Sequence, residues 1–140
     1  MKGDSSMATI RHLAIRTENP ERLAQFYIDV FGFKELYRGG RPGNPDTRSV
    51  QLTDGYFELA ILDNSKQQSR NGLYHFGIQI DDPEGTIERI KTFQPNKAPR
   101  RRPEGIPYAE MRLSDPDGNL IDLSVHGFLD WQPVEKDSLK

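Results

Sequence analysis

Two histidines and two carboxylates recur along this chain at nearly equal spacing. His12 and Glu58 are 46 residues apart, and His75 and Asp122 are 47 residues apart. Imidazole nitrogens and carboxylate oxygens suit divalent first-row metals, and a carboxylate can also move a proton to or from carbon. These residue types therefore predict a metal centre with acid–base chemistry, provided that the fold brings the four side chains together.

An internal repeat underlies this spacing. Residues 12–21 align without a gap with residues 75–84, at a constant offset of 63. Each copy begins with a histidine and alternating apolar residues, which is the period of a β-strand with one face on a core. An Asx-Pro-Glu unit follows, beginning at Asn19 in one copy and Asp82 in the other, and supplies an N-cap, a proline at the first helical position and an early acid. Each half is therefore expected to form a strand followed by a helix.

Strand segments and turns are expected after each helix. The expected hairpin strands are 49–52 with 56–62 in the first half, and 108–113 with 120–125 in the second. In the first helix, apolar residues at i, i+3, i+4 and i+7 are expected to pack in the core, and Gly32 is expected to end the helix. These core candidates are Leu23, Phe26, Tyr27 and Val30. The second helix is a weaker copy, with Ile87, Ile90 and Phe93.

The alternation within each strand separates the polar candidates from the core. In the two repeated strands the apolar positions must face the helices, so His12 and His75 point to the opposite face. The same parity places Glu58 and Asp122 on that face. Two halves with these faces together would bring all four side chains into one cleft. Four further residues share the cleft-facing parity and are expected to contact a substrate: Gln51, Tyr108, Glu110 and Arg112.

With these segments in view, the sequence resembles the vicinal oxygen chelate superfamily, which includes glyoxalases, bleomycin-resistance proteins and extradiol dioxygenases. The resemblance is carried by 10–15, 24–33 and 115–123, and extends over about 10–125. It implies an α+β fold, in which two βαβββ modules form a single glyoxalase-like domain with a curved mixed sheet around a cleft. It also implies that the family's four metal-binding cleft positions are here His12, Glu58, His75 and Asp122.

By this resemblance, the protein is expected to be a metal-dependent lyase or isomerase/epimerase of the glyoxalase type. The metal, one of Ni, Co, Zn, Mn or Fe, would chelate two neighbouring oxygens of a small substrate and act as a Lewis acid on a developing enolate. Glu58 and Asp122 are the expected catalytic residues, and the resemblance would allow either as the base. Glu58 is the better candidate, because its longer side chain reaches further, and Asp122 is the more fixed ligand.

Two alternatives stay open. One is an Fe(II) extradiol-type dioxygenase, because such enzymes use two histidines and one carboxylate. The other is a metal-free protein of the same fold that binds a small molecule, such as an antibiotic.

The expected domain spans 8–126, with one module at 8–63 and the other at 72–126. Residues 1–7 are expected to be a disordered extension, and 127–140 a C-terminal tail. A homodimer is expected from the family resemblance. Three apolar tail residues are candidates for covering its interface: Phe128, Leu129 and Trp131.

Composition limits the other possibilities. A chain of 140 residues has room for one domain, and its apolar stretches are too short to span a bilayer. A net charge of −2 gives no long-range attraction to nucleic acid, and the basic run 100–102 is expected to be a solvated loop. The chain has no cysteine and no apolar signal segment at its start, which fits a cytoplasmic protein with a small-molecule partner.

Overall fold

The computed structural model describes residues 7–39, 48–67, 69–102 and 109–129. Tyr108 and Trp131 therefore lie outside the described residues. In chain order the elements are β1 (Ala8–Thr17), α1 (Pro20–Phe31), β2 (Lys34–Arg38), β3 (Ser49–Thr53), β4 (Glu58–Asp63), β5 (Gly72–Ile80), α2 (Pro83–Phe93), β6 (Arg100–Arg101), β7 (Met111–Ser114) and β8 (Leu120–Ser124).

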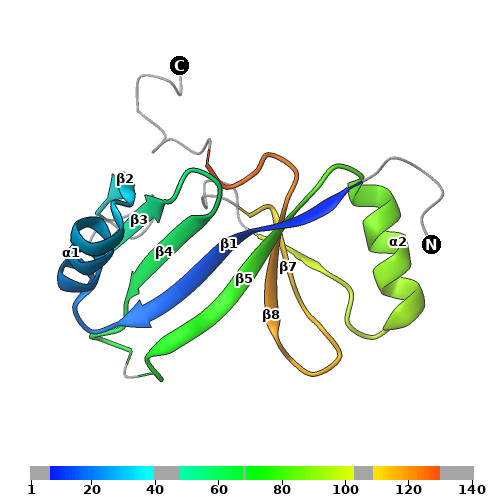
Figure 1. The fold of residues 1–140 in the computed structure, drawn as a ribbon. Coiled ribbons are helices and arrows are strands. Elements are labelled where there is room, and N and C mark those ends of the chain that lie inside the picture. Colours follow the sequence, from blue (N-terminus) through cyan, green and yellow to red (C-terminus); the bar gives the residue numbers. More distant parts are fainter. Residues whose placement is uncertain (1–6, 40–47, 68, 103–108, 130–140) are drawn as a thin grey trace, which may run out of the picture.

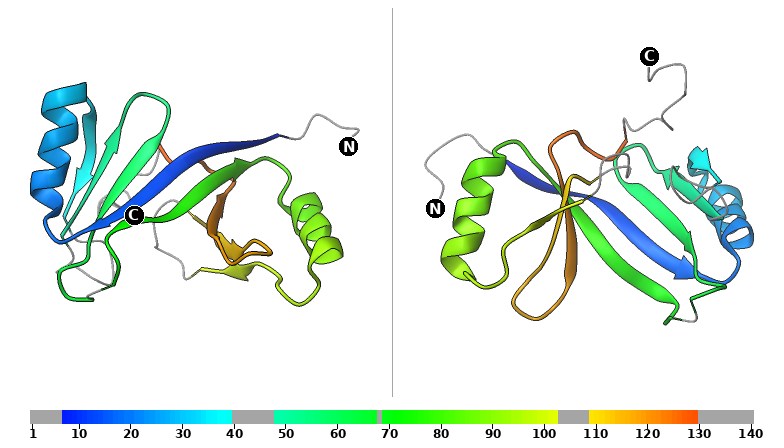
Figure 2. Two further views of the ribbon diagram at one scale, coloured as in Figure 1. Left: turned by 60° about the horizontal axis from the view of Figure 1, so that its bottom comes forward. Right: turned by 180° about the vertical axis from the view of Figure 1, so that it is seen from behind.

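All the described strands join one mixed sheet of eight strands, in the order β2-β3-β4-β1-β5-β8-β7-β6. Within each βαβββ module the first and last strands pair in parallel, β1 with β4 and β5 with β8. The two modules join where β1 runs antiparallel to β5. Figures 1 and 2 show these two long strands crossing the middle of the sheet, with α1 and α2 near its opposite ends. The predicted fold, two βαβββ modules in one α+β domain, is confirmed.

Both helices begin where the Asx-Pro units predict. The Asn19 side chain accepts a hydrogen bond from the backbone N–H of Arg22 at 3.1 Å, and Asp82 accepts one from Gly85 at 3.1 Å. A proline follows each cap at the first helical position, where its missing N–H costs no helical hydrogen bond. Gly32 ends α1 with φ of +74°, the left-handed conformation that glycine adopts without strain.

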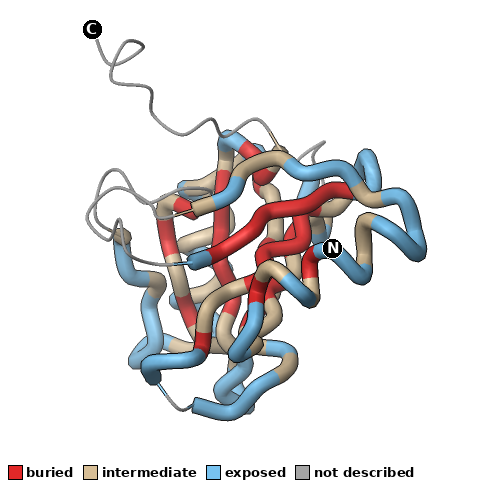
Figure 3. Tube along the Cα trace, turned by 90° about the vertical axis from the view of Figure 1, so that its left-hand side faces the viewer, coloured by how far each residue is buried: buried red, intermediate tan, exposed pale blue. Residues whose placement is uncertain are grey.

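Each module has its own apolar core between its helix and its part of the sheet. The first core contains Ala24, Val50, Leu52, Leu59 and Ile61, and the second contains Ile80, Met111, Leu113, Ile121 and Leu123. Figure 3 shows the buried positions concentrated along the strands, and Ala24 is the member of the first core that lies on α1. The strand parity predicted from the sequence is therefore confirmed.

The helix faces are only partly as predicted. Leu23 and Tyr27 pack against the first core, but Phe26 and Val30 are exposed. Pro20 and Ala24 are the fully buried positions of α1, so its buried stripe is rotated away from Phe26 and Val30. On α2, Ile87 and Ile90 pack against the second core, whereas Phe93 is exposed. Among the described residues, neither helix is long and apolar enough to cross a membrane.

Arg48, just before β3, ties the start of α1 to the end of β4. Its guanidinium donates hydrogen bonds to Glu21 at 3.1 Å, to the carbonyl oxygen of Glu18 at 3.0 Å and to Asp63 at 3.3 Å. Burial by itself would raise the pKa of Asp63. The hydrogen bonds from Arg48 and the backbone of Ser65 outweigh that effect and lower the pKa to about 2.

Candidate metal centre

The register of the four central strands puts three of the predicted ligands in one row. His12 on β1 lies opposite Glu58 on β4 and opposite Gly77 on β5, and Gly77 lies opposite Asp122 on β8. His75 stands two residues from Gly77, on the same face of β5, because strand side chains alternate. The strands that carry this row are adjacent in Figure 1. The four predicted side chains are therefore brought together.

Three of them direct ligand atoms at one point. The Nε2 atoms of His12 and His75 are 3.1 Å apart, and His75 Nε2 is 3.1 Å from Asp122 Oδ2. One ligand atom from each of the three residues lies within 4.8 Å of the others, and all three side chains are buried. With metal–nitrogen bonds of about 2.1 Å, neighbouring ligands of one ion lie roughly 3.0–3.4 Å apart. The spacing and chemistry of these donors therefore fit a divalent ion.

Glu58 occupies a different position from the other three. Its carboxylate Oε1 contacts Nδ1 of His12, the ring nitrogen that faces away from His75. The residue is fully buried, and its Oε2 has no hydrogen-bond partner among the described residues. Burial raises the pKa of Glu58, although the contact with His12 opposes this effect. Glu58 is therefore placed to orient His12 and to hold its Nδ1 proton, which leaves Nε2 as a lone-pair donor.

Asp122 is held by cations as well as by His75. Arg112 Nε donates to Asp122 Oδ1 at 2.6 Å, and Arg102 Nη1 lies 3.8 Å from Oδ2. Burial alone would raise the pKa of Asp122, but the hydrogen bonds from His75 and Arg112 outweigh burial and hold that pKa well below its usual range. Burial lowers the pKa of His75. Asp122 is thus an anion, and its Oδ2 faces the histidines.

The other predicted site residues have separate environments. Gln51 is buried on the cleft face, and its Oε1 has no hydrogen-bond partner among the described residues. Arg112 points to the cleft face, as predicted, where it binds Asp122. Glu110 accepts hydrogen bonds from the Ser124 hydroxyl and the Val125 backbone. The expectation that Glu110 and Arg112 contact a substrate stays a prediction, and Tyr108 is outside the described residues.

Two residues that sequence reasoning placed elsewhere belong to this centre. Phe128, assigned to the tail and to a possible interface, is buried, and its ring stacks on His12. It is therefore not available to cover an interface. Arg102, from the basic run expected to be a solvated loop, pairs with Asp122, while Arg100 and Arg101 form the exposed strand β6. In the sequence, only the apolarity of Phe128 indicated that this residue would be buried. Nothing in the local sequence distinguishes Arg102 from its neighbours.

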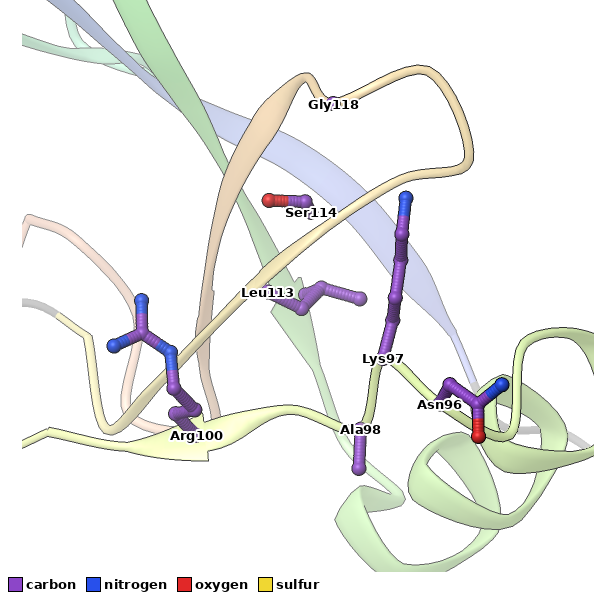
Figure 4. Close-up of a pocket in the computed structure, with 7 residues that line it drawn as sticks. All are labelled: Asn96, Lys97, Ala98, Arg100, Leu113, Ser114 and Gly118. Atoms are coloured by element: carbon purple, nitrogen blue, oxygen red, sulfur yellow. The ribbon is translucent and has the colours of Figure 1, made fainter.

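A separate pocket lies in the second module. It is formed by the chain between α2 and β6 together with the β7–β8 hairpin, and Lys97 extends across it toward that hairpin (Figure 4). Its lining includes Leu113, a member of the second core, but none of the predicted site residues. The pocket is therefore distinct from the metal centre.

Comparisons with known proteins agree with this fold. A sequence model of the Glyoxalase/Bleomycin resistance protein/Dioxygenase superfamily matches residues 9–123. Catechol-2,3-dioxygenase from Bacillus subtilis (strain 168) is 33% identical in an alignment of 111 residues, which covers 74% of this chain and 36% of that protein. The chain thus spans about a third of the length of this curated relative.

Solved structures show the same fold at low sequence identity. A hypothetical protein from Bacillus halodurans C-125 has a TM-score of 0.61 and 17% identity, over 83% of this chain and 92% of that one. A methylmalonyl-CoA epimerase in complex with methylmalonyl-CoA has a TM-score of 0.59 and 19% identity, over 84% of this chain and 93% of that one.

Proposed function

The chain belongs to the Glyoxalase/Bleomycin resistance protein/Dioxygenase superfamily, and from that premise we propose that it is a metal-dependent lyase or isomerase/epimerase acting on a small substrate with two neighbouring oxygens. One observation carries the proposal. Three buried donors, His12, His75 and Asp122, converge on one point, and the fully buried carboxylate of Glu58 stands beside them. This combination supplies both a cation site and a group able to move a proton.

In this proposal His12, His75 and Asp122 hold a divalent ion of Ni, Co, Zn, Mn or Fe. When bound, such an ion supplies a Lewis acid that polarises the oxygens of the substrate. The protein residues set the conditions for that binding. Glu58 keeps the Nδ1 proton on His12, and Arg112 engages Oδ1 of Asp122 so that Oδ2 is presented to the centre.

Glu58 is the proposed base for proton transfer next to a carbonyl group. A general base works best when its pKa lies near the working pH, and burial raises the pKa of Glu58 toward that range. Asp122 is the poorer candidate, because Arg112 and His75 hold its pKa low. The two carboxylates thus have different proposed roles, acid–base chemistry for Glu58 and ligation for Asp122.

One observation favours a second function, that of an Fe(II) dioxygenase. Two histidines and one carboxylate form the ligand set of non-haem Fe(II) oxygenases, and the three convergent residues here match that set. The similarity to a catechol-2,3-dioxygenase points the same way. In this alternative Glu58 only orients His12 and takes no proton from the substrate.

Elemental analysis and two assays distinguish the candidates. Protein purified without chelators should contain about one divalent ion per chain. Substrates such as acyl-CoA esters and 2-hydroxy thiol adducts are then incubated in deuterated water, and exchange of the α proton is followed by NMR. Catechols are tested in parallel with anaerobically Fe(II)-loaded protein and an oxygen electrode. Proton exchange that is lost in Glu58→Gln supports the lyase or isomerase. Oxygen uptake without exchange supports the dioxygenase, and a metal-free protein that only binds ligands contradicts both.

A further inference from the structure

The chain that follows β8 turns back into the metal centre, and polar contacts hold this turn in place. Gly127 donates its backbone N–H to the Ser124 hydroxyl at 3.0 Å and has φ of +90°. Glu110 accepts the Val125 N–H at 2.6 Å and lies 3.0 Å from the Ser124 hydroxyl. Because Ser124 and Gly127 are buried, these hydrogen bonds are shielded from water and fix the direction in which the chain leaves the turn.

The turn places the Phe128 ring against the face of the His12 imidazole. The Phe128 side chain is only 1% exposed, and its ring lies parallel to the His12 imidazole, with 4.9 Å between centroids and 3° between planes. Stacking on one face limits rotation of the imidazole about its side-chain bonds, which a single hydrogen bond at Nδ1 does not. Glu58 at the ring edge and Phe128 at the ring face therefore constrain His12 in two independent ways.

Gly77 makes room for this arrangement. A Cβ atom added at Gly77 would lie 2.6 Å from Phe128 Cζ and 2.8 Å from His12 Cβ, which is closer than carbon atoms approach. Any other residue at this position would displace one of the two rings. Gly77 lies in the row between His12 and Asp122, and the Phe128 ring occupies the space that a side chain at Gly77 would need.

We propose that Phe128 is a positioning residue for the metal centre, which holds the His12 ring so that Nε2 points at His75 and Asp122. This inference rests on the proposed metal-binding function, and it adds the segment after β8, with Ser124, Gly127 and Glu110 as its anchors, to the machinery of the site. Phe128 acts through His12 and needs no contact with the ion or the substrate.

The test uses Phe128→Leu, which keeps most of the apolar volume but cannot stack. The matched control is Phe93→Leu, the same substitution at an exposed position on α2. The chain has three histidines, so labelled imidazoles give few NMR signals, and exposed His126 is an internal reference. Nitrogen shifts at constant pH report which nitrogen of His12 carries the proton, and calorimetry with Zn(II) and Co(II) reports affinity.

In the parent we expect metal-free His12 to hold its proton on Nδ1 alone. In Phe128→Leu we expect averaged nitrogen shifts for His12 and metal affinity at least tenfold weaker, as for loss of a group that orients a ligand. His126 should not change, and Phe93→Leu should behave as the parent. If Phe128→Leu lowers the Tm but leaves the His12 shifts and the metal affinity unchanged, Phe128 only fills space and the inference is wrong.

A second variant and measurements on the metal-free protein separate failure of the proposed metal binding from failure of the role proposed for Phe128. Gly77→Ala should perturb the same His12 signals, because its Cβ must displace Phe128 or His12. Unchanged His12 signals in Gly77→Ala would also contradict the inference. If the parent binds neither metal, the proposed function fails, yet the His12 shifts of the metal-free variants still decide whether Phe128 orients the ring.

Discussion

The two buried carboxylates should respond differently to amide substitution. In Asp122→Asn the half-buried Arg112 loses the carboxylate that it binds at 2.6 Å, and His75 loses an anionic neighbour 3.1 Å away. Removing one partner of a buried ion pair costs about 3–5 kcal/mol. Arg112 keeps some contact with solvent, so we expect a loss of about 2 kcal/mol in the free energy of unfolding. Asp122 also supplies one of the three proposed ligand atoms. Metal affinity should therefore fall more than 100-fold, which exceeds the loss of about 10- to 100-fold that is typical when a residue that only orients a ligand is removed.

Glu58→Gln is the contrasting change. The amide oxygen can still accept the His12 Nδ1 proton, while the amide NH2 would lie where Oε2 has no hydrogen-bond partner among the described residues. We expect a loss of about 1 kcal/mol in stability. Metal affinity should fall by about tenfold, and α-proton exchange by about a hundredfold or more.

Urea unfolding gives the stability changes, and calorimetry with Co(II) gives the affinities. Glu88→Gln, the same carboxylate-to-amide change at an exposed position on α2, is the matched control. If Glu58→Gln loses metal as completely as Asp122→Asn does, Glu58 is itself a ligand and the separation of roles is wrong.

Three further predictions follow from other parts of the molecule. His12→Ala and His75→Ala should each lose stoichiometric metal in elemental analysis, whereas exposed His126→Ala should keep it; metal retained in the double His12/His75 variant would refute the centre. Arg48→Ala should have a lower Tm than the parent at pH 6, because the stabilisation from the lowered pKa of Asp63 is complete above the ordinary carboxyl pKa near 4 and is lost as the pH falls through about 2. This difference should shrink as the pH falls toward 2, and a gap that stays constant with pH would exclude this ion pair as its source. The protein is also expected to be a two-fold symmetric homodimer, and light scattering that shows only monomer at high micromolar concentration would contradict it.

Local patterns in the sequence determined the repeated strands and helices and the faces of the strands. The 63-residue repeat predicted a strand and a helix in each half, and the structure has them at Ala8–Thr17 with Pro20–Phe31 and at Gly72–Ile80 with Pro83–Phe93. Caps, prolines and strand alternation act over a few residues, so they can be recognised without knowledge of the rest of the fold. The same alternation correctly placed His12, His75, Glu58 and Asp122 on the face away from both cores.

Only the tertiary structure determined which of the four side chains converge on one point and which one lies beside them. From the sequence, both Glu58 and Asp122 are expected to contact the metal, but the pairing of β4 places Glu58 opposite His12, and the pairing of β8 places Asp122 opposite Gly77. That difference in register sends one carboxylate to the outer nitrogen of His12 and the other to the convergent point.

The contacts of Arg102 and Phe128 could likewise not be predicted from local sequence patterns. Arg102 reaches Asp122 across the sheet, and Phe128 reaches His12 from 116 residues away in sequence. Sequence periodicity determines which face of a strand a residue occupies. The register between strands and the course of the chain after β8 depend on packing among residues far apart in sequence, and these contacts determine which atoms meet.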